Sequence, residues 1–264
     1  APLPVAAFLS VVSKIAGFAI AIRILIDIYS QSVFTAIFIG IVAILTMTIG
    51  NIGAITQTNL KRIMAYSSIA QAGYILAGVA VLTKIGMSAS IFYIVCYLFM
   101  NFGAWAAIEV LVKKTGKSEI SDMSGLAYSN MPLALGFTLC LLSLAGLPLT
   151  AGFWGKFYLF GSIFLAGPLF LPLFAAALIN TVLGLYYYTK IIKSMFSKPF
   201  DRTSFDNNII KKPIYMSTAL IFCCISVLII SVVASPFITI AQKTVISASN
   251  PDNSIKRLNY FYKK

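Results

Sequence analysis

Residues 142–160 read LSLAGLPLTAGFWGKFYLF, an apolar stretch that three glycines and Pro148 interrupt just before Lys156. As a single helix, the apolar block from about 133 to 165 would be roughly 50 Å long, against a hydrocarbon core of about 30 Å. Two complete membrane spans would need roughly 20 residues each and a turn, which this block cannot supply. The sequence therefore predicts one span that is broken near Pro148, with a lysine beside the break.

The break and the lysine together favour transport. Non-helical backbone at membrane depth persists only where protein or a water-filled cavity satisfies its polar groups. Ionisable residues inside spans are costly, and in broken helices they commonly mark ion or proton pathways. We therefore take Lys156 as a candidate proton-transfer residue. The alternative is a lysine near a helix end that reaches the membrane interface.

Composition places the whole chain in a membrane. Hydrophobic residues make up 59% of the 264 residues and charged residues only 10%, whereas average chains contain about 45–50% apolar residues. The 20 Lys and Arg residues against 7 Asp and Glu do not indicate nucleic acid, because they lie between apolar runs. Membrane orientation and anionic lipids explain them better.

Run length predicts an all-α polytopic membrane protein with about seven transmembrane helices. The expected spans are 4–26, 33–55, 63–82, 87–112, the broken span 132–165, 170–196 and 213–240. Residues 1–242 are expected to form a single transmembrane domain, followed by a polar, basic tail at 243–264.

Basic residues predict the orientation. When alternate connections between spans are assigned to alternate sides of the membrane, most of the basic residues fall on one side: Lys61, Arg62, Lys113, Lys114, Lys117, Lys190, Lys193, Lys198, Arg202, Lys211 and Lys212. The opposite side has only Arg23 and Lys84 between spans. By the positive-inside rule, the first side faces the cytoplasm, matrix or stroma.

Lys14 is a second candidate for proton transfer. It lies about ten residues into the first span, hence roughly 15 Å deep. A lysine there costs at least about 2.5–3.5 kcal/mol on insertion scales, and desolvation favours the uncharged amine. The alternative is a structural ion pair or a lysine that snorkels to the interface.

Lys61 is a further candidate, within the polar run TQTNLKRIMAYSSIAQAGY at 56–74. Tyr66, Ser67 and Gln71 in this run could line a water path or form hydrogen bonds between helices. An anchoring role for Lys61 at the interface remains equally open.

Other polar residues have simpler interpretations. Glu109 and Lys113, four residues apart, predict a surface ion pair rather than a proton carrier. The tyrosines at 186–188 indicate an aromatic belt, with quinone stacking as the alternative. The chain has no histidine, and its four cysteines lie within apolar runs without a CxxC pair. We therefore predict no metal or cofactor site in this chain.

Three of these stretches resemble the antiporter-like subunits of respiratory complex I, and within them the subunit 2 family: 56–74, 142–160 and GLYYYTKIIKSM at 184–195. The resemblance implies a fold of fourteen spans with two inverted five-helix repeats, each containing a broken helix. This chain would then be the C-terminal half, and its first span would be the family's eighth. Lys14 and Lys156 match family lysines, the latter on the side leading outward, and Lys61 matches a basic position.

The resemblance implies a membrane-arm subunit of a complex-I-like NAD(P)H- or ferredoxin:quinone oxidoreductase that translocates protons as quinone is reduced. Flavin, iron–sulfur centres and quinone are then expected elsewhere in the complex. The alternatives are a multi-chain cation/proton antiporter, a membrane-bound hydrogenase, or a purely structural half-subunit.

Expected partners are other membrane-arm subunits and lipids, but no nucleic acid. The expected membrane is mitochondrial inner, bacterial plasma or thylakoid. Because the first seven helices of the family fold do not precede Ala1 here, we expect either a separate chain that supplies them or a sequence that is part of a longer one.

Overall fold

The computed structural model describes residues 3–28, 32–116, 118–198 and 214–248. Within these ranges the regular structure is helical, apart from an isolated β-bridge between Asn59 and Glu119. The α-helices are α1 (Leu3–Ile28), α2 (Val33–Ile55), α3 (Leu60–Ala80), α4 (Lys84–Thr115), α5 (Leu126–Ser129), α6 (Met131–Ala145), α7 (Ala151–Leu165), α8 (Leu171–Phe196), α9 (Ile214–Val232) and α10 (Ala234–Ala248). Short 3-10 turns occur at Ser121–Met123 and Pro168–Phe170.

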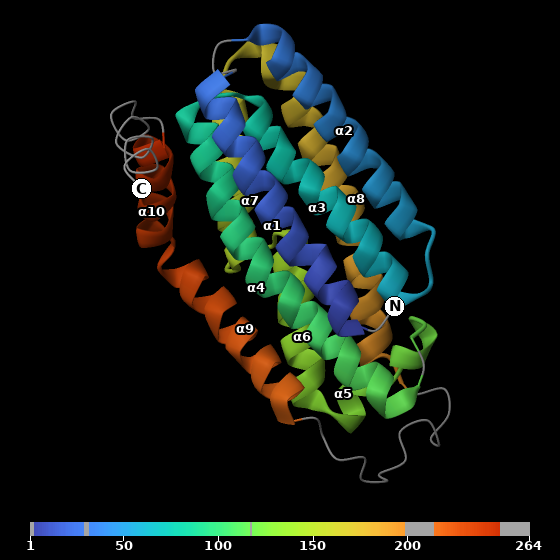
Figure 1. Ribbon diagram of the computed structural model, residues 1–264. Coiled ribbons are helices and arrows are strands. Elements are labelled where there is room, and N and C mark those ends of the chain that lie inside the picture. The colour runs from blue at the N-terminus through green and yellow to red at the C-terminus, as the bar shows by residue number, and fades with distance from the viewer. Residues whose placement is uncertain (1–2, 29–31, 117, 199–213, 249–264) are drawn as a thin grey trace.

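The long helices run side by side in a bundle whose centre is formed by α3 and α4 (Figure 1). In the apolar stretches of these two helices 72% of residues are buried, against 17–28% in α1, α2, α8 and α9. Helix α4 contacts α1, α3, α6, α7, α9 and α10, while α2 packs on α3 and α8. The outer helices turn apolar side chains such as Phe34, Phe38 and Phe222 outward, as membrane-spanning helices do.

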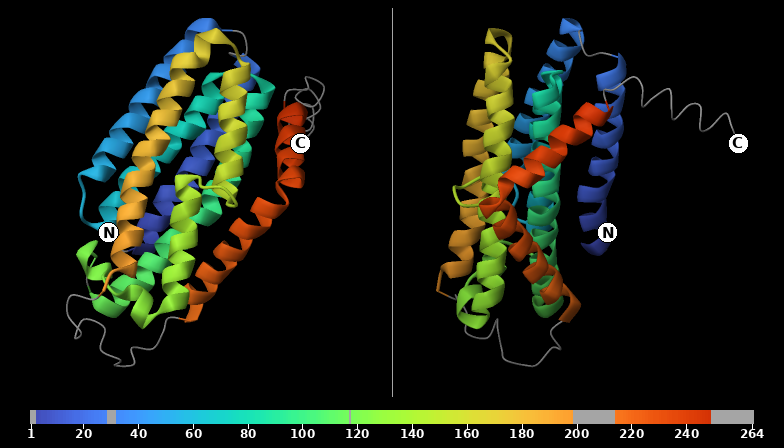
Figure 2. Two further views of the ribbon diagram at one scale, coloured as in Figure 1. Left: turned by 180° about the vertical axis from the view of Figure 1, so that it is seen from behind. Right: turned by 90° about the vertical axis from the view of Figure 1, so that its left-hand side faces the viewer.

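Six of the described helices are long and apolar enough to cross a membrane. The remaining expected crossing is divided into α6 and α7, which confirms the prediction of a span broken near Pro148 (Figure 2). Gly146 ends α6 with a φ of +86°, a left-handed conformation that glycine adopts without a steric penalty. Pro148 follows and lacks the N–H that a continuing helix would need.

Helices α3 and α4 begin earlier than the predicted 63 and 87 because polar residues cap them. Asn59 accepts a hydrogen bond from the backbone N–H of Lys61, and Thr83 accepts one from that of Gly86. Such caps satisfy N–H groups that a helix start leaves free. A prediction from apolar run length does not include polar capping residues, so both predicted helix starts were wrong by three residues.

The prediction of one helix over 213–240 was also wrong. Helix α9 ends at Val232, and α10 continues from Ala234 to Ala248 at a marked angle (Figure 2). Pro236 explains the break, because its ring excludes a continuous helix but is tolerated in the first turn of a new one. Helix α10 extends six residues into the expected tail at 243–264. Residues 249–264 of that tail lie outside the described part of the chain, and so does Pro213. The division into membrane domain and tail stays a prediction.

The connections predicted to share one side meet in space. Residues 58–60, in the loop between α2 and α3, pair with residues 118–120, in the loop after α4. Two backbone hydrogen bonds join them, from Leu60 to Ser118 and from Ile120 to Thr58, and we call this contact the loop clasp. Ser194, near the end of α8, donates to the carbonyl of Ile120 at 2.6 Å. The basic ends of α3, α4 and α8 therefore lie at one end of the bundle, as expected when alternate connections lie on alternate sides of the membrane. Lys117, Arg202, Lys211 and Lys212 lie outside the described residues, and the orientation in the membrane stays a prediction.

Candidate proton-transfer site

Lys156 is buried against the helix break. Its Nζ donates to the carbonyl oxygens of Leu144 and Ala145, both at 3.0 Å, in the last turn of α6. These carbonyls lack helical partners because α6 ends there, and they carry the partial negative charge of a helix C-terminus. The amine also lies 4.8 Å from the centre of the Tyr74 ring, a favourable cation–π position. The break and the lysine thus form one unit.

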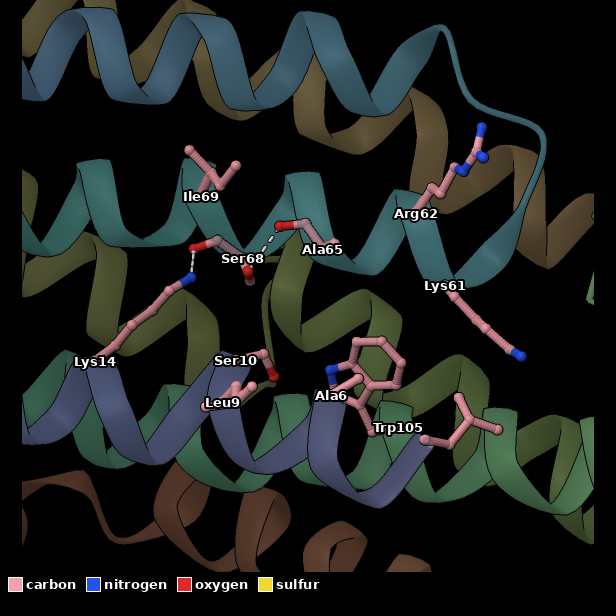
Figure 3. A pocket seen from close by; sticks show the side chains of 11 residues that line it. Ala6, Leu9, Ser10, Lys14, Lys61, Arg62, Ala65, Ser68, Ile69 and Trp105 are labelled. Carbon is pink, nitrogen blue, oxygen red and sulfur yellow. Dashed lines mark hydrogen bonds between the residues drawn. The ribbon is translucent and has the colours of Figure 1, made fainter. Parts of the chain in front are cut away.

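Lys14 of α1 reaches inward to α3. Its Nζ donates to the backbone carbonyl of Ser68, as Figure 3 shows. The side chain is half-buried and lines an open pocket of about 420 Å³ between α1, α3 and α4. Lys14 therefore lies inside the bundle and makes its contact with the central helix.

Buried polar side chains lie between the contacts of the two lysines, although their hydrogen bonds do not form one continuous chain. Gln71 Nε2 donates to the carbonyl of Leu144 at 3.1 Å and to Tyr188 Oη at 3.3 Å. The Tyr188 hydroxyl in turn lies 2.5 Å from Ser67 Oγ. Ser67 precedes Ser68, whose carbonyl accepts from Lys14. We call this series the polar file: Lys14, Ser68, Ser67, Tyr188, Gln71 and Lys156.

Helical spacing on α3 aligns this file. Ser67, Gln71 and Tyr74 follow one another at intervals of four and three residues, which places them on one face of the helix. That face is buried between α4, α7 and α8. Tyr93 of α4 donates to Gln71 Oε1 and so holds its amide. The file is therefore centred on α3, one of the two most buried long helices, and is held there by a residue of the other, α4.

A second polar cluster joins α2 to α8 beside the file. Asn51 Nδ2 donates to Asn180 Oδ1 at 2.9 Å, and Tyr187 donates to Asn51 Oδ1 at 3.2 Å. The Tyr187 and Tyr188 rings lie 4.4 Å apart, centre to centre. Hydrogen bonds between spans hold helices together in the absence of water, so this cluster fixes the position of Tyr188.

Two of the candidate residues lie outside the file. Lys61 is half-exposed and lines the pocket that also contains Lys14. Tyr66 packs its ring close to Gly53 of α2, away from the face that carries Ser67. The structure thus places Ser67 and Gln71 beside Tyr188, and Gln71 and Lys156 on the same Leu144 carbonyl. Lys14 lies next to this group, on the carbonyl of Ser68. Tyr66 lies outside it, and Lys61 lines the Lys14 pocket.

The predicted pairing of Glu109 with Lys113 is confirmed, with Nζ and Oε1 2.7 Å apart, but its predicted place at the surface is wrong for Glu109. Glu109 itself is buried while Lys113 is exposed. In the described ranges, no three His, Cys, Asp or Glu side chains gather in a way that could hold a metal ion.

Sequence reasoning missed Tyr188 of the file and Tyr187 beside it. The prediction of an aromatic belt at 186–188 was wrong for Tyr187 and Tyr188, which are 2% and 1% exposed, whereas Tyr186 is 57% exposed. Asn180, Gly184 and Tyr188 recur every four residues. That period places the three residues on one face of the helix, but the period alone does not show that this face is buried.

The chain matches the family model described as "NADH:quinone oxidoreductase/Mrp antiporter, TM" over residues 1–184. It is 42% identical over 257 residues to NAD(P)H-quinone oxidoreductase subunit 2 of Acaryochloris marina. The aligned region covers 92% of this chain and 48% of that protein. It is 41% identical to the chloroplastic NAD(P)H-quinone oxidoreductase subunit 2 of Chaetosphaeridium globosum, over 93% of this chain and 50% of that protein.

Among solved structures, it resembles a chain of the membrane-bound sulfane sulfur reductase, an archaeal respiratory membrane complex. The TM-score is 0.79 at 24% identity, over 95% of this chain and 50% of that chain, a likeness of fold. The chain spans about half the length of the curated relatives it matches. With its helical architecture and its family match over 1–184, it is an integral membrane protein. The chain belongs to the NADH:quinone oxidoreductase/Mrp antiporter transmembrane family.

Proposed function

We propose that this chain acts within subunit 2 of a complex-I-like NAD(P)H:quinone oxidoreductase and moves protons between Lys14 and Lys156 as other subunits reduce quinone. Its similarity to subunit 2 proteins supports the assignment to that subunit. The observation that carries the proton-transfer role is the buried polar file between the two lysines.

Each component of the file has a chemical part. The hydroxyls of Ser67 and Tyr188 can donate one proton while accepting another, so a proton can pass between these two groups. The carbonyls of Ser68 and Leu144 only accept, so the steps to Lys14 and Lys156 would pass through intervening water. The amide of Gln71 donates in two directions, to Leu144 and Tyr188, and so orients its neighbours. The carbonyls of α6 and the ring of Tyr74 stabilise the charged amine of Lys156.

The two lysines would alternate in charge. In a medium of low dielectric, like charges repel strongly over short distances. We propose that a change of charge at a neighbouring subunit shifts the proton from one amine to the other. We propose that the redox centres, quinone included, lie in partner subunits, and that the first half of the antiporter-like fold completes the path. The proposed location is an energy-transducing membrane.

Lysine replacement in the assembled complex tests this function. In sealed vesicles, Lys14→Met and Lys156→Met should each reduce proton pumping per electron transferred by at least about tenfold, as loss of a positioned acid–base group does. Lys84→Met is the matched control, because Lys84 is exposed at the start of α4. Intact pumping in both lysine variants would instead support a purely structural half-subunit.

A multi-chain cation/proton antiporter is the second candidate, since the family description also names Mrp antiporters. Replacing sodium with potassium or choline separates the two. Pumping that persists without sodium and follows quinone reduction supports the oxidoreductase, whereas sodium-dependent proton exchange in the absence of electron donor supports the antiporter.

A further inference from the structure

The first turn of α7 is capped by a residue of another helix. Thr150 stands at the N-cap position, where a Ser, Thr, Asp or Asn side chain usually accepts a hydrogen bond from the second or third residue of the helix. Thr150 makes no such bond within the described part of the chain, and its hydroxyl donates instead to the carbonyl of Leu147 at 2.7 Å. The backbone N–H of Gly152 donates to Ser143 Oγ of α6 at 3.1 Å. Ser143 therefore supplies the cap that α7 does not receive from Thr150, and we call this contact the Ser143 cap.

The Ser143 hydroxyl is directed away from its own helix. Serines within helices commonly donate to a carbonyl one turn earlier, as Ser162 of α7 does to Leu159. Ser143 instead donates to Met100 Sδ of α4 at 3.5 Å while it accepts from Gly152. Its side chain is 0% exposed. Removing the hydroxyl would therefore take a partner away from a buried N–H, which is costly.

A glycine brings the two half-helices close enough for this cap. A Cβ added to Gly152 would meet the carbonyl oxygen of Ser143 at 1.8 Å, much closer than real Cβ contacts come. Helices α6 and α7 thus approach each other backbone to backbone at this point. Glycine permits the approach, and the hydroxyl of Ser143 gives it a directional bond.

The Ser143 cap and the contact of Lys156 join the same turns of the two helices. Ser143 directly precedes Leu144, whose carbonyl accepts from Lys156 at 3.0 Å. Gly152 lies four residues before Lys156, one turn earlier on the same face of α7. The broken span is therefore closed twice, by the cap and by the lysine. Because the two contacts are one turn apart, a displacement at the cap moves the lysine as well.

We propose that Ser143 is a positioning residue for Lys156: its hydroxyl holds the first turn of α7 against the end of α6 and so keeps the amine on the carbonyls of Leu144 and Ala145. This inference rests on the proposed function of Lys156. Without the cap, α7 can shift against α6, and the amine loses the geometry in which it exchanges its proton. Pumping then falls although the lysine itself is still present.

Ser143→Ala in the assembled complex tests the cap. In sealed vesicles, proton pumping per electron transferred should fall about 2- to 10-fold, the range for one lost hydrogen bond, while quinone reduction continues. Ser162→Ala is the matched control, because Ser162 is also buried on α7 but bonds within its own helix, and it should leave pumping unchanged. Unchanged pumping in Ser143→Ala overturns the proposal.

A second pair of variants separates the hydroxyl from the space that it fills. Ser143→Thr keeps the hydroxyl, whereas Ser143→Val has the same branched shape without it, so the effect of the added methyl group cancels. Ser143→Thr should pump about 2- to 10-fold better than Ser143→Val, and equal pumping overturns the proposal. Where Ser143→Ala fails to assemble, this pair decides.

Two further measurements separate the possible failures. A loss in Ser143→Ala that appears in thermal unfolding of the complex but not in pumping per electron overturns the proposal, since Ser143 would then serve stability alone. Intact pumping in Lys156→Met would refute the proposed function. Reduced pumping in Lys156→Met with intact pumping in Ser143→Ala would refute only the role of Ser143.

Discussion

At the scale of a single residue, the surroundings of the Lys156 amine determine what it can do. The amine meets two carbonyls and an aromatic face, none of which carries a full charge. A carboxylate partner would hold the proton permanently, because an ion pair at low dielectric strongly favours the charged amine. Carbonyl dipoles stabilise the charge more weakly, so the proton can leave. The surroundings of Lys156 therefore suit a residue that exchanges protons.

Tyr188 provides a prediction at this scale. Tyr188→Phe removes the hydroxyl that bridges Ser67 and Gln71 while keeping the buried ring. A net hydrogen bond contributes about 0.5–1.5 kcal/mol, so pumping should fall about 2- to 10-fold, with quinone reduction continuing. Proton uptake and electron transfer are measured together in vesicles. Tyr186→Phe, on the outward-facing neighbour, serves as control, and equal pumping in the two variants would contradict the role of Tyr188.

The lysines of the file could be predicted from the sequence and its tyrosine, Tyr188, could not, for a physical reason. A charge inside an apolar span has few explanations, so Lys14 and Lys156 stand out one by one. A tyrosine suits both the membrane interface and a buried hydrogen-bonded position. Tyr186 and Tyr188 differ only in the helix face they occupy, and that face depends on how α8 packs against α2 and α3.

At the scale of elements, the site depends on the α6–α7 break. The break frees the carbonyls of Leu144 and Ala145, and the turn places Lys156 beneath them. Leu149 within the turn has a φ of +68°, a conformation that costs a non-glycine residue about 1–2 kcal/mol. Surrounding contacts must offset that cost, as is common where backbone strain accompanies function.

Gly146→Ala tests the turn. A Cβ there would meet Lys156 Cδ at 2.8 Å, on backbone with a φ of +86°. We expect a loss of about 1–2 kcal/mol of stability from the left-handed backbone alone, together with reduced pumping as Lys156 is displaced. Gly161→Ala in α7 is the matched control, because a Cβ there meets nothing within 4 Å. Thermal unfolding of the purified complex measures the difference, and equal effects would exclude a special role for Gly146.

The loop clasp supplies a prediction about pH. Hydrogen bonds from Thr58 and Asn59, aided by the charge of Arg62, lower the pKa of Glu119 below its ordinary value. A carboxylate with a lowered pKa stabilises the clasp above its ordinary pKa of about 4.3, and this contribution is lost as pH falls through the lowered value. Hydrogen exchange of Leu60 and Ile120, corrected for intrinsic rates, should therefore accelerate in acid.

Glu119→Gln should show the weaker protection already at neutral pH and lose the acid dependence. The apolar centre of α4 serves as internal control, because its amides do not contact the clasp. Unchanged protection of Leu60 in the variant would mean that the backbone bonds alone hold these loops together.

At the scale of the molecule, spans and loops differ in how far the sequence predicts them. The number and order of apolar helices follow from transfer free energy, which is a sum over residues. The helix starts at Leu60 and Lys84 depend on single capping hydrogen bonds, and the end of α9 depends on one proline. The polar file depends on four helices at once, α1, α3, α7 and α8, and no local pattern contains it.

At the scale of the whole molecule, the proposed function requires that Lys14 and Lys156 act in series. Steps in series are not additive: once one is blocked, blocking the other adds little, whereas independent routes multiply their losses. We therefore expect the double variant Lys14→Met/Lys156→Met to pump no worse than the poorer single variant, measured per electron transferred. The pair Lys84→Met/Lys156→Met should match Lys156→Met alone. Multiplied losses in the Lys14/Lys156 pair would mean two separate proton routes, and the hydrogen bonds between α3 and α8 would then serve packing alone.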